Sequence, residues 1–302
     1  MATQAASQVS FPDPRPVRMM VPIGATDCHM HVFEIGYALS PNRTYTPPAA
    51  PLDQYRKVAA ALHLTRAVVV QPSAYGTDNS CTLDAVAAFG PSARAVVGID
   101  TRIADDELDH MHARGARGVR INAASRGLHD SDEIADLIAT TAKRIDRLGW
   151  HVQVFTDLAV IERLNRCLRT LSVPIVIDHM GLAQASEGPA QAGLASLGDL
   201  LASGRCWVKL SGVYRVSGQE PDFADGSAII QTLIDANPDR VVWGTDWPHT
   251  ASHGHAQSAA APAIAYRPLD TAALLEQLAA CAGNASVVDK ILVDNPAQLY
   301  GF

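Results

Sequence analysis

The chain contains 302 residues, of which 48% are apolar and 18% are charged, and its formal net charge is -7 at pH 7. This composition is typical of a folded globular protein and excludes a largely disordered chain. Lysine and arginine are scattered rather than clustered, so the sequence offers no basic footprint for nucleic acid or for an anionic membrane. We therefore expect a small-molecule partner.

The first residues are expected to form an extended arm. Residues 1–22 lack the continuous apolar stretch of a secretory signal, and no later run approaches the length of a membrane span. Pro12, Pro14 and Pro16 favour extended backbone over helix. We expect this arm over residues 1–22 and a single domain over residues 23–302, because barrels of this size often fold as one unit.

The cysteines indicate a reducing compartment, and we expect a cytoplasmic protein. They form no CxxC pair and leave an odd number, so the sequence predicts neither a zinc knuckle nor a disulfide framework. The oligomeric state stays open, with a homo-oligomer among the outcomes. The five residues are Cys28, Cys81, Cys167, Cys206 and Cys281.

Short β-branched runs alternate with stretches of helical periodicity from residue 23 onward. This alternation is typical of repeated βα units that form a parallel sheet. Helices are expected over residues 52–62, 131–147, 158–168 and 228–237. The eight runs expected to be strands cover residues 24–33, 66–73, 94–100, 118–122, 151–156, 174–180, 207–213 and 240–247.

Eight parallel strands with intervening helices favour a closed (β/α)8 barrel, the TIM-barrel fold, because closure removes both exposed sheet edges. The alternative is an open doubly wound sheet. That fold would usually carry a GxGxxG loop after an early strand, and this sequence has none. Residues 249–268, rich in Ala, His and Ser, are expected to form a long loop after the eighth strand that helps to cover the active site.

Four reactive residues lie at predicted strand ends, where barrel enzymes place their catalytic groups. His29 and His31 lie at the end of the first strand and are expected on the same face, because side chains alternate along a strand. His179 ends the sixth strand and Asp246 ends the eighth. A single HxH or Asp-His pair also occurs by chance in a protein core. The prediction of an active site rests on finding such residues at three strand ends at once.

Three imidazoles and one carboxylate are ligand types that borderline-soft divalent ions prefer. The sequence predicts that His29, His31, His179 and Asp246 are catalytic and suit a divalent ion, zinc being the expected one. We expect His249, His253 and His255, in the loop, to be solvated or rim residues without an assigned role.

Cationic and hydroxyl side chains near the same strand ends are candidates for substrate binding. Guanidinium groups suit bidentate contacts with carboxylate or sulfonate. Each candidate also has a structural alternative, such as a surface charge for Arg126 or a packing role for Tyr45. The candidates are Arg120, Arg126, Arg215, Ser73, Tyr75 and Tyr45.

The motifs HMHVF, VQPSAYGTDN, RGVRIN, PIVIDHMG, VKLSGVY and VVWGTDWPH together resemble the amidohydrolase-related family. The resemblance covers nearly the whole chain and points to the branch of 2-pyrone-4,6-dicarboxylate lactonase, 4-sulfomuconolactone hydrolase and D-galactarolactone isomerase. It implies that His29, His31, His179 and Asp246 form the active centre. It also implies that the bridging lysine and fifth-strand histidine of binuclear relatives are absent, in agreement with Arg120–Asn122 and Phe155–Thr156 at those strand ends. The resemblance therefore implies at most one divalent ion, which is dispensable in some relatives.

Two positions depart from the pyrone-dicarboxylate lactonase pattern. Leu182 stands where that enzyme would have an arginine, and Phe155 stands where it would have a tyrosine. Because unmatched carboxylates would be desolvated at considerable cost, these changes favour a lactone with one fewer acidic group, a sulfonate or a more apolar ring.

The sequence therefore predicts a hydrolase that opens a small anionic lactone of the muconolactone, pyrone-carboxylate or sulfomuconolactone type. Asp246 would accept the proton of the attacking water while the histidines, directly or through an ion, stabilise the oxyanion. A serine nucleophile is not expected, because GxSxG is absent. The alternatives are a sugar-lactone isomerase, a metal-dependent decarboxylase of an aromatic or enol acid, and a binding module without catalysis.

Overall fold

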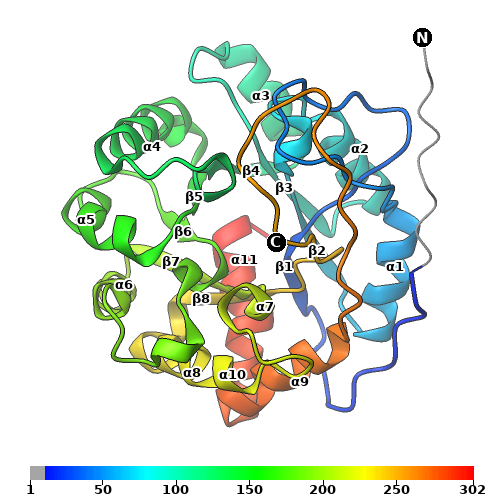
Figure 1. The fold of residues 1–302 in the computed structure, drawn as a ribbon, viewed down its shortest axis with the longest axis vertical. Coiled ribbons are helices and arrows are strands. Elements are labelled where there is room, and N and C mark those ends of the chain that lie inside the picture. Colours follow the sequence, from blue (N-terminus) through cyan, green and yellow to red (C-terminus); the bar gives the residue numbers. More distant parts are fainter. Residues whose placement is uncertain (1–10) are drawn as a thin grey trace.

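The computed structural model describes residues 11–302, and its centre is one parallel sheet of eight strands in the order of the sequence (Figure 1). The predicted (β/α)8 barrel is confirmed. Residues 1–10, which belong to the expected arm, lie outside the described residues. The strands are β1 (Thr26–Met30), β2 (Arg66–Val70), β3 (Ala93–Val97), β4 (Ala116–Asn122), β5 (His151–Phe155), β6 (Ile175–Ile177), β7 (Cys206–Ser211) and β8 (Val241–Gly244).

The barrel closes between β1 and β8 through backbone hydrogen bonds at the carboxyl ends of these strands. The amide of Asp246 donates to the carbonyl of His29 over 2.8 Å, and the amide of His31 donates to the carbonyl of Trp247 over 2.9 Å. Met30 and Trp247 form an isolated parallel bridge. Three of the four residues expected in the active centre therefore lie at the point of closure.

Helices surround the strands, with α11 behind the centre of the barrel in Figure 1. All four helices expected from periodicity occur. Among residues 11–302, no helix combines the length and the apolar character needed to cross a bilayer. The helices are α1 (Leu52–Ala61), α2 (Ser80–Phe89), α3 (Asp105–Ala113), α4 (Ser131–Ile145), α5 (Leu158–Leu168), α6 (Leu194–Ala202), α7 (Val213–Val216), α8 (Ser227–Ala236), α9 (Thr271–Ala282), α10 (Ala285–Asp289) and α11 (Asn295–Tyr300).

The helix α4 illustrates how local sequence fixes these elements. The Asp130 side chain caps its start by accepting hydrogen bonds from the amides of Asp132 and Glu133. Ile134, Ile138 and Ile145 recur at helical spacing and are buried. Capping and periodicity thus agree on one helix that packs its apolar face against the sheet.

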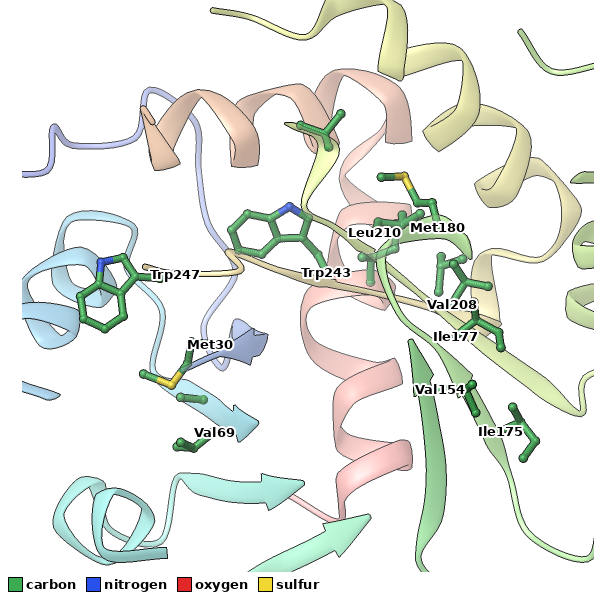
Figure 2. Close-up of a cluster of buried hydrophobic side chains, with 14 of the residues drawn as sticks. Met30, Val69, Val154, Ile175, Ile177, Met180, Val208, Leu210, Trp243 and Trp247 are labelled. Carbon is green, nitrogen blue, oxygen red and sulfur yellow. The ribbon is translucent and has the colours of Figure 1, made fainter. Parts of the chain in front are cut away.

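Strand side chains alternate between two apolar layers. On β2, Ala67 and Val69 belong to the layer between strands and helices, and Val68 and Val70 belong to the layer inside the barrel. Figure 2 shows part of the outer layer, including Val69. Because both faces of a barrel strand are buried, the runs are nearly continuously apolar. The inner layer consists of Cys28, Val68, Val70, Val96, Val176, Trp207, Val242 and Tyr300.

The described part of the N-terminal segment packs along α1 and α9 without helix or strand. The Phe11 ring lies 5.3 Å from that of Trp247 and 5.8 Å from that of Tyr266. Arg15 pairs with Glu276 over 2.8 Å and with Asp270 over 2.6 Å. These contacts attach the segment to both ends of the long stretch between β8 and α9.

Candidate active site

The four residues expected in the active centre come together at the carboxyl ends of the strands. His29 lies on β1 and His31 directly after it. His179 begins a short 3-10 helix after β6, and Asp246 follows β8 by two residues. All four are buried, with exposed fractions of 0%, 5%, 1% and 1% respectively.

The Oδ1 atom of Asp246 is the centre of this group. It lies 3.6 Å from Nε2 of His29, 3.7 Å from Nε2 of His31 and 3.9 Å from Nε2 of His179. The two Nε2 atoms of His29 and His31 are 3.3 Å apart. Among residues 11–302, this buried Oδ1 has no hydrogen-bond donor.

This spacing fits a divalent ion. Ligand atoms about 2.0–2.2 Å from a tetrahedral zinc ion lie roughly 3.3–3.6 Å from one another. The ligand atoms of His29, His179 and Asp246 lie within 4.8 Å of one another, and His31 lies beside two of the three. A small inward movement would complete a four-ligand set, so the residues present suit a metal.

Polar contacts on the far side of each ring surround the imidazoles. Nδ1 of His31 lies 2.7 Å from the carbonyl of Val70, which can only accept, so this nitrogen carries the proton. Nδ1 of His179 lies 2.9 Å from Oγ of Ser211, and that of His29 lies 3.3 Å from Oδ1 of Asp178. For His31, the Nε2 lone pair points into the site, as metal ligation requires. Nδ1 of His29 also has Nζ of Lys209 at 3.4 Å, and Oδ1 of Asp178 has no hydrogen-bond donor among residues 11–302.

Burial keeps the histidines neutral. It lowers the pKa of His31 to about 3 and that of His179 to about 4, and it also lowers the pKa of His29 well below its usual range. All three rings therefore have lone pairs available at neutral pH.

The second oxygen of Asp246 is fixed by two donors. Oδ2 accepts hydrogen bonds from the Tyr214 hydroxyl over 2.6 Å and from Nε of Arg215 over 2.8 Å, and both donors lie on α7. Burial alone would raise the pKa of Asp246, but Arg215 and the histidines outweigh it and hold the pKa well below its usual range. The carboxylate is therefore ionised, with only Oδ1 facing the three imidazoles.

Gly212 permits this close packing. Its φ is +62°, and a Cβ there would lie 2.9 Å from Nδ1 of His179 and 3.1 Å from Oδ2 of Asp246. Any side chain at this position would therefore press on two members of the active centre as well as strain the backbone.

A buried polar network that the sequence reasoning missed lies beside His29. Nζ of Lys209 on β7 donates to Oε1 of Gln153 over 2.6 Å and to the carbonyl of Cys28 over 2.8 Å. Nε2 of Gln153 donates to Oδ2 of Asp178 over 3.0 Å. Burial lowers the pKa of Lys209 to about 8. The sequence did offer one signal of this network, because Lys209 is a charged residue at an inward position of a mostly apolar strand.

The predicted arginines occupy three different environments. Arg120 donates from Nε to Asp178 over 3.2 Å and from Nη1 to the carbonyl of Gln71 over 3.3 Å. Arg215 donates to Asp246 and, over 3.3 Å, to the carbonyl of Thr250. Arg126 is exposed, in the short 3-10 helix after β4. Arg120 and Arg215 thus border the histidine cluster, and Arg126 lies at the surface.

The predicted hydroxyl donors also differ. Tyr45 is buried, with its ring 4.5 Å from that of His253. Ser73 begins the 3-10 helix after β2 and is half-buried. The Tyr75 hydroxyl donates to the carbonyl of Glu34 over 3.4 Å, so a contact within the loops already uses it.

The loop histidines correct one expectation. His249 is only 4% exposed and its ring lies 5.9 Å from that of Tyr214, so the prediction that it is solvated was wrong. The backbone turns back directly after Asp246, because the His249 amide donates to the Asp246 carbonyl over 2.8 Å and both residues have positive φ. His255 is exposed, as expected, and His253 is partly buried against Tyr45.

The stretch between β8 and α9 crosses the strand ends as a long loop. Figure 1 shows it, mostly in orange, running from β8 towards α2 and back to α9. Thr46 donates to the Pro262 carbonyl over 2.8 Å, and Thr250 bridges to Tyr266. His255 reaches the carbonyl of Ser125 over 3.3 Å. The loop thus spans from the segment after β1 to the segment after β4.

A closed ring of parallel strands with three neutral imidazoles and an ionised carboxylate at its carboxyl ends defines an enzyme of the (β/α)8 class built for metal-assisted or acid–base hydrolysis. The family model described as amidohydrolase matches residues 26–302. The chain therefore belongs to the amidohydrolase family, and the resemblance seen in its motifs is confirmed.

Curated relatives carry out lactone chemistry. The chain is 35% identical to a 4-sulfomuconolactone hydrolase of Hydrogenophaga intermedia, over 95% of this chain and 91% of that protein. It is 32% identical to a D-galactarolactone isomerase of Agrobacterium fabrum, over 92% and 91% of the two chains. An apo crystal structure of an Agrobacterium tumefaciens protein superimposes with a TM-score of 0.79 at 29% identity, covering 93% of this chain and 97% of that one.

Proposed function

We propose that this enzyme hydrolyses a small anionic lactone with an activated water molecule. The observation that carries the proposal is the unshared Oδ1 of Asp246, buried within 3.9 Å of three imidazole nitrogens while its partner oxygen is held by Tyr214 and Arg215. The similarity to a lactone hydrolase over 95% of the chain supports the same reaction.

His29, His31, His179 and Asp246 would hold one divalent ion, which we propose to be zinc. When bound, the ion supplies Lewis-acid polarisation of the ester carbonyl. The neutral histidines suit this role because protonated rings could not bind a cation.

Asp246 serves as the general base. Its Oδ1 accepts a proton from the water whose oxygen bonds to the lactone carbonyl carbon, and its orientation is fixed through Oδ2. The ring C–O bond then breaks, and the alkoxide takes up the proton, giving a hydroxy acid. Fixing one carboxylate oxygen with two donors keeps the other aimed at the reacting centre without reorganisation.

Substrate charge would be matched by the cations at the strand ends. Arg120 and Arg215 would bind carboxylate or sulfonate groups, with Arg126 at the exposed rim, and Ser73 and Tyr45 would donate hydroxyl hydrogen bonds. Tyr75 would join them by exchanging its contact with the Glu34 carbonyl. The Phe155 ring lies 5.1 Å from His179 and 5.6 Å below the guanidinium of Arg120, so it adds apolar surface close to the site. This surface and Leu182 favour a substrate with fewer acidic groups than a pyrone dicarboxylate.

An isomerase is the second candidate, favoured by the D-galactarolactone isomerase among the relatives. In that reaction a hydroxyl of the substrate, instead of water, would attack the carbonyl. We favour hydrolysis, because the four-residue ligand and base set is complete and suits the activation of water.

One assay separates the candidates. Purified protein is incubated in ¹⁸O-labelled water with muconolactones, sulfomuconolactones, pyrone carboxylates and sugar-acid lactones, while acid release is titrated. Hydrolysis places one label in the new carboxylate, isomerisation gives a new lactone without label, and decarboxylation releases carbon dioxide. Failure to incorporate label with every lactone would refute the proposed hydrolysis.

We also propose a cytoplasmic location for the enzyme. All five cysteines are free thiols and four are buried, which suits the reducing cytoplasm. We propose a small anionic lactone as the partner, with no role for nucleic acid or membrane, and a homo-oligomer is compatible with this. Sedimentation velocity of the purified chain tests the last point.

A further inference from the structure

Three arginines lie together at the amino-terminal end of the barrel, the end opposite to the active centre. Arg66 begins β2, Arg94 is the second residue of β3 and Arg117 is the second residue of β4. The three strands are neighbours in the sheet, so the starts of all three lie on one side of the same rim. Basic residues that are scattered along the sequence are thus brought together by the fold.

The last two residues of the chain lie among these arginines. The ring centre of Phe302 is 5.3 Å from the guanidinium carbon of Arg66 and 4.7 Å from that of Arg94. Nη2 of Arg94 also donates to the carbonyl of Gly301 over 2.6 Å. A Cβ at Gly301 would lie 4.0 Å from Nε of Arg117. All three guanidinium groups therefore surround one short segment, residues 301–302.

A β-bulge sets the direction of Arg117. The register between β3 and β4 shifts at this residue, so it is the extra residue of the bulge. Bulges often re-aim a side chain at a functional position. Nη1 of Arg117 donates to the carbonyls of His112 over 3.1 Å and Ala116 over 2.6 Å, whereas its Nε and Nη2 have no acceptor among residues 11–302. The guanidinium group is thus held on one side and unused on the other.

The other two arginines also have unused donors. Among residues 11–302, the side chain of Arg66 donates no hydrogen bond, and its Nη1 is buried. The Nε atom of Arg94 is likewise buried without an acceptor. Because a buried N–H group without an acceptor is costly, such groups usually have a bound partner from outside the chain.

The protein does not neutralise the three positive charges. Every ion pair between an arginine and a carboxylate among residues 11–302 involves other arginines, and the C-terminal carboxylate takes part in none of them. Residues 1–10 contain neither aspartate nor glutamate. Burial, Arg117 and Arg66 all lower the pKa of Arg94, and no carboxylate opposes this shift. The missing partner is therefore an anion.

We propose that Arg66, Arg94 and Arg117 form a binding site for a phosphate group, either the free ion or that of a small monoester. Guanidinium forks match the oxygens of phosphate, and a phosphate group carries about -1.5 to -2 charges at pH 7, which suits three cations better than a single carboxylate does. Each of the three side chains is partly exposed, so the site can be reached from solvent. The site is independent of the proposed lactone chemistry, because it lies at the other end of the barrel.

The test is isothermal titration calorimetry of the full chain with inorganic phosphate, with the ionic strength held constant by sodium chloride. We expect saturable binding at one site, and a melting temperature that rises with phosphate but not with chloride at equal ionic strength. Glycerol 3-phosphate is the second probe. If it binds at least as tightly as inorganic phosphate, the site accepts a monoester, and if it binds more weakly, the site is built for the free ion.

Variants at Arg66 locate the binding. Arg66→Met removes the charge and five donors without breaking a hydrogen bond to residues 11–302, so phosphate affinity should fall at least about tenfold. Arg66→Lys keeps the charge but loses the fork, and its affinity should lie between the two. This variant also replaces Arg66→Met if the latter does not fold.

Arg205→Met is the matched control. Arg205 is exposed at the same end of the barrel, directly before β7, and its only side-chain hydrogen bond among residues 11–302 goes to the carbonyl of Leu171 over 2.8 Å. Its loss changes the net charge by the same amount but should leave phosphate affinity unchanged.

Three results would overturn the inference. Binding that persists in Arg66→Met but is lost in Arg120→Met would place the phosphate in the active centre. Equal stabilisation by chloride would show that salt only screens the repulsion between the arginines. Absence of phosphate binding would be expected if the C-terminal carboxylate fills the site in solution. Failure of the wild-type protein to hydrolyse lactones would refute only the proposed function, because no step of this test depends on turnover.

Discussion

The two ends of the barrel interior are built from different chemistry. At the carboxyl ends of the strands lie three histidines, Asp178, Asp246 and Lys209, which are linked by polar contacts. At the other end, Tyr300 and the inner valines pack against Trp207, and Arg94 covers the Phe302 ring at 4.7 Å. A single strand such as β7 contributes to both, because inward positions two residues apart lie at different depths. Chemistry and stability are thus separated along the strand direction.

The largest effect that tests this separation is expected for Asp246→Asn. The amide oxygen can still accept from Tyr214 and Arg215, but the general base is lost, so kcat should fall by about 10²- to 10⁴-fold. The melting temperature should change little. Turnover by the lactone assay and thermal unfolding by circular dichroism measure the two quantities, and wild-type kcat in this variant would contradict the assigned role.

Tyr300→Ala is the complementary change at the opposite end. The ring is fully buried in the inner layer, so its removal should lower the free energy of unfolding by about 3–5 kcal/mol. The kcat of the folded fraction should stay close to wild type. Denaturant unfolding measures the loss, and Tyr300→Phe, which keeps the ring, is the control. A large drop in kcat with unchanged stability would contradict the assignment of this end of the barrel to stability.

Acid should destabilise the protein, because buried neutral histidines lie at both ends of the barrel interior. Burial lowers the pKa of His31 and His151 to about 3 and that of His179 and His249 to about 4. Between about pH 6.5 and pH 4 the unfolded chain binds protons that the folded chain does not, so the free energy of unfolding falls as the pH falls.

Each such histidine contributes a slope of up to about 1.4 kcal/mol per pH unit. Burial raises the pKa of Asp27 to about 6, which opposes this slope in part. Denaturant unfolding at several pH values measures the slope. His151→Phe removes one buried imidazole from outside the active centre and should flatten it while preserving kcat at pH 7, and an unchanged slope would show that His151 does not contribute.

The smallest effect is expected for the N-terminal segment. Arg15→Met breaks pairs with Glu276 and Asp270 that are partly exposed, so it should lower the free energy of unfolding by less than about 1 kcal/mol. High salt should reduce the difference further. Arg102→Met, at an exposed pair with Asp100, is the matched control. A loss comparable to that of Tyr300→Ala would place this segment within the core of the fold.

The fold and the four-residue cluster were predictable because both depend on local pattern. The alternation of runs gave the strands, and parallel strands bring their carboxyl ends to one rim, which assembled His29, His179 and Asp246. The contacts of Lys209 were not predictable, because Gln153 and Asp178 come from other strands and their depth depends on register. The burial of His249 depends on a backbone turn with positive φ, which cannot be predicted from the residue type.

The closure between β1 and β8 makes the site depend on two segments that are far apart in the chain. The bonds from Asp246 to His29 and from His31 to Trp247 join segments more than two hundred residues apart. Without β8 and the turn that follows it, the two histidines at the end of β1 would lie at an open sheet edge and lack their carboxylate partner. Loss of β8 and the residues that follow it should therefore abolish activity, even where the other seven strands and all three histidines are retained.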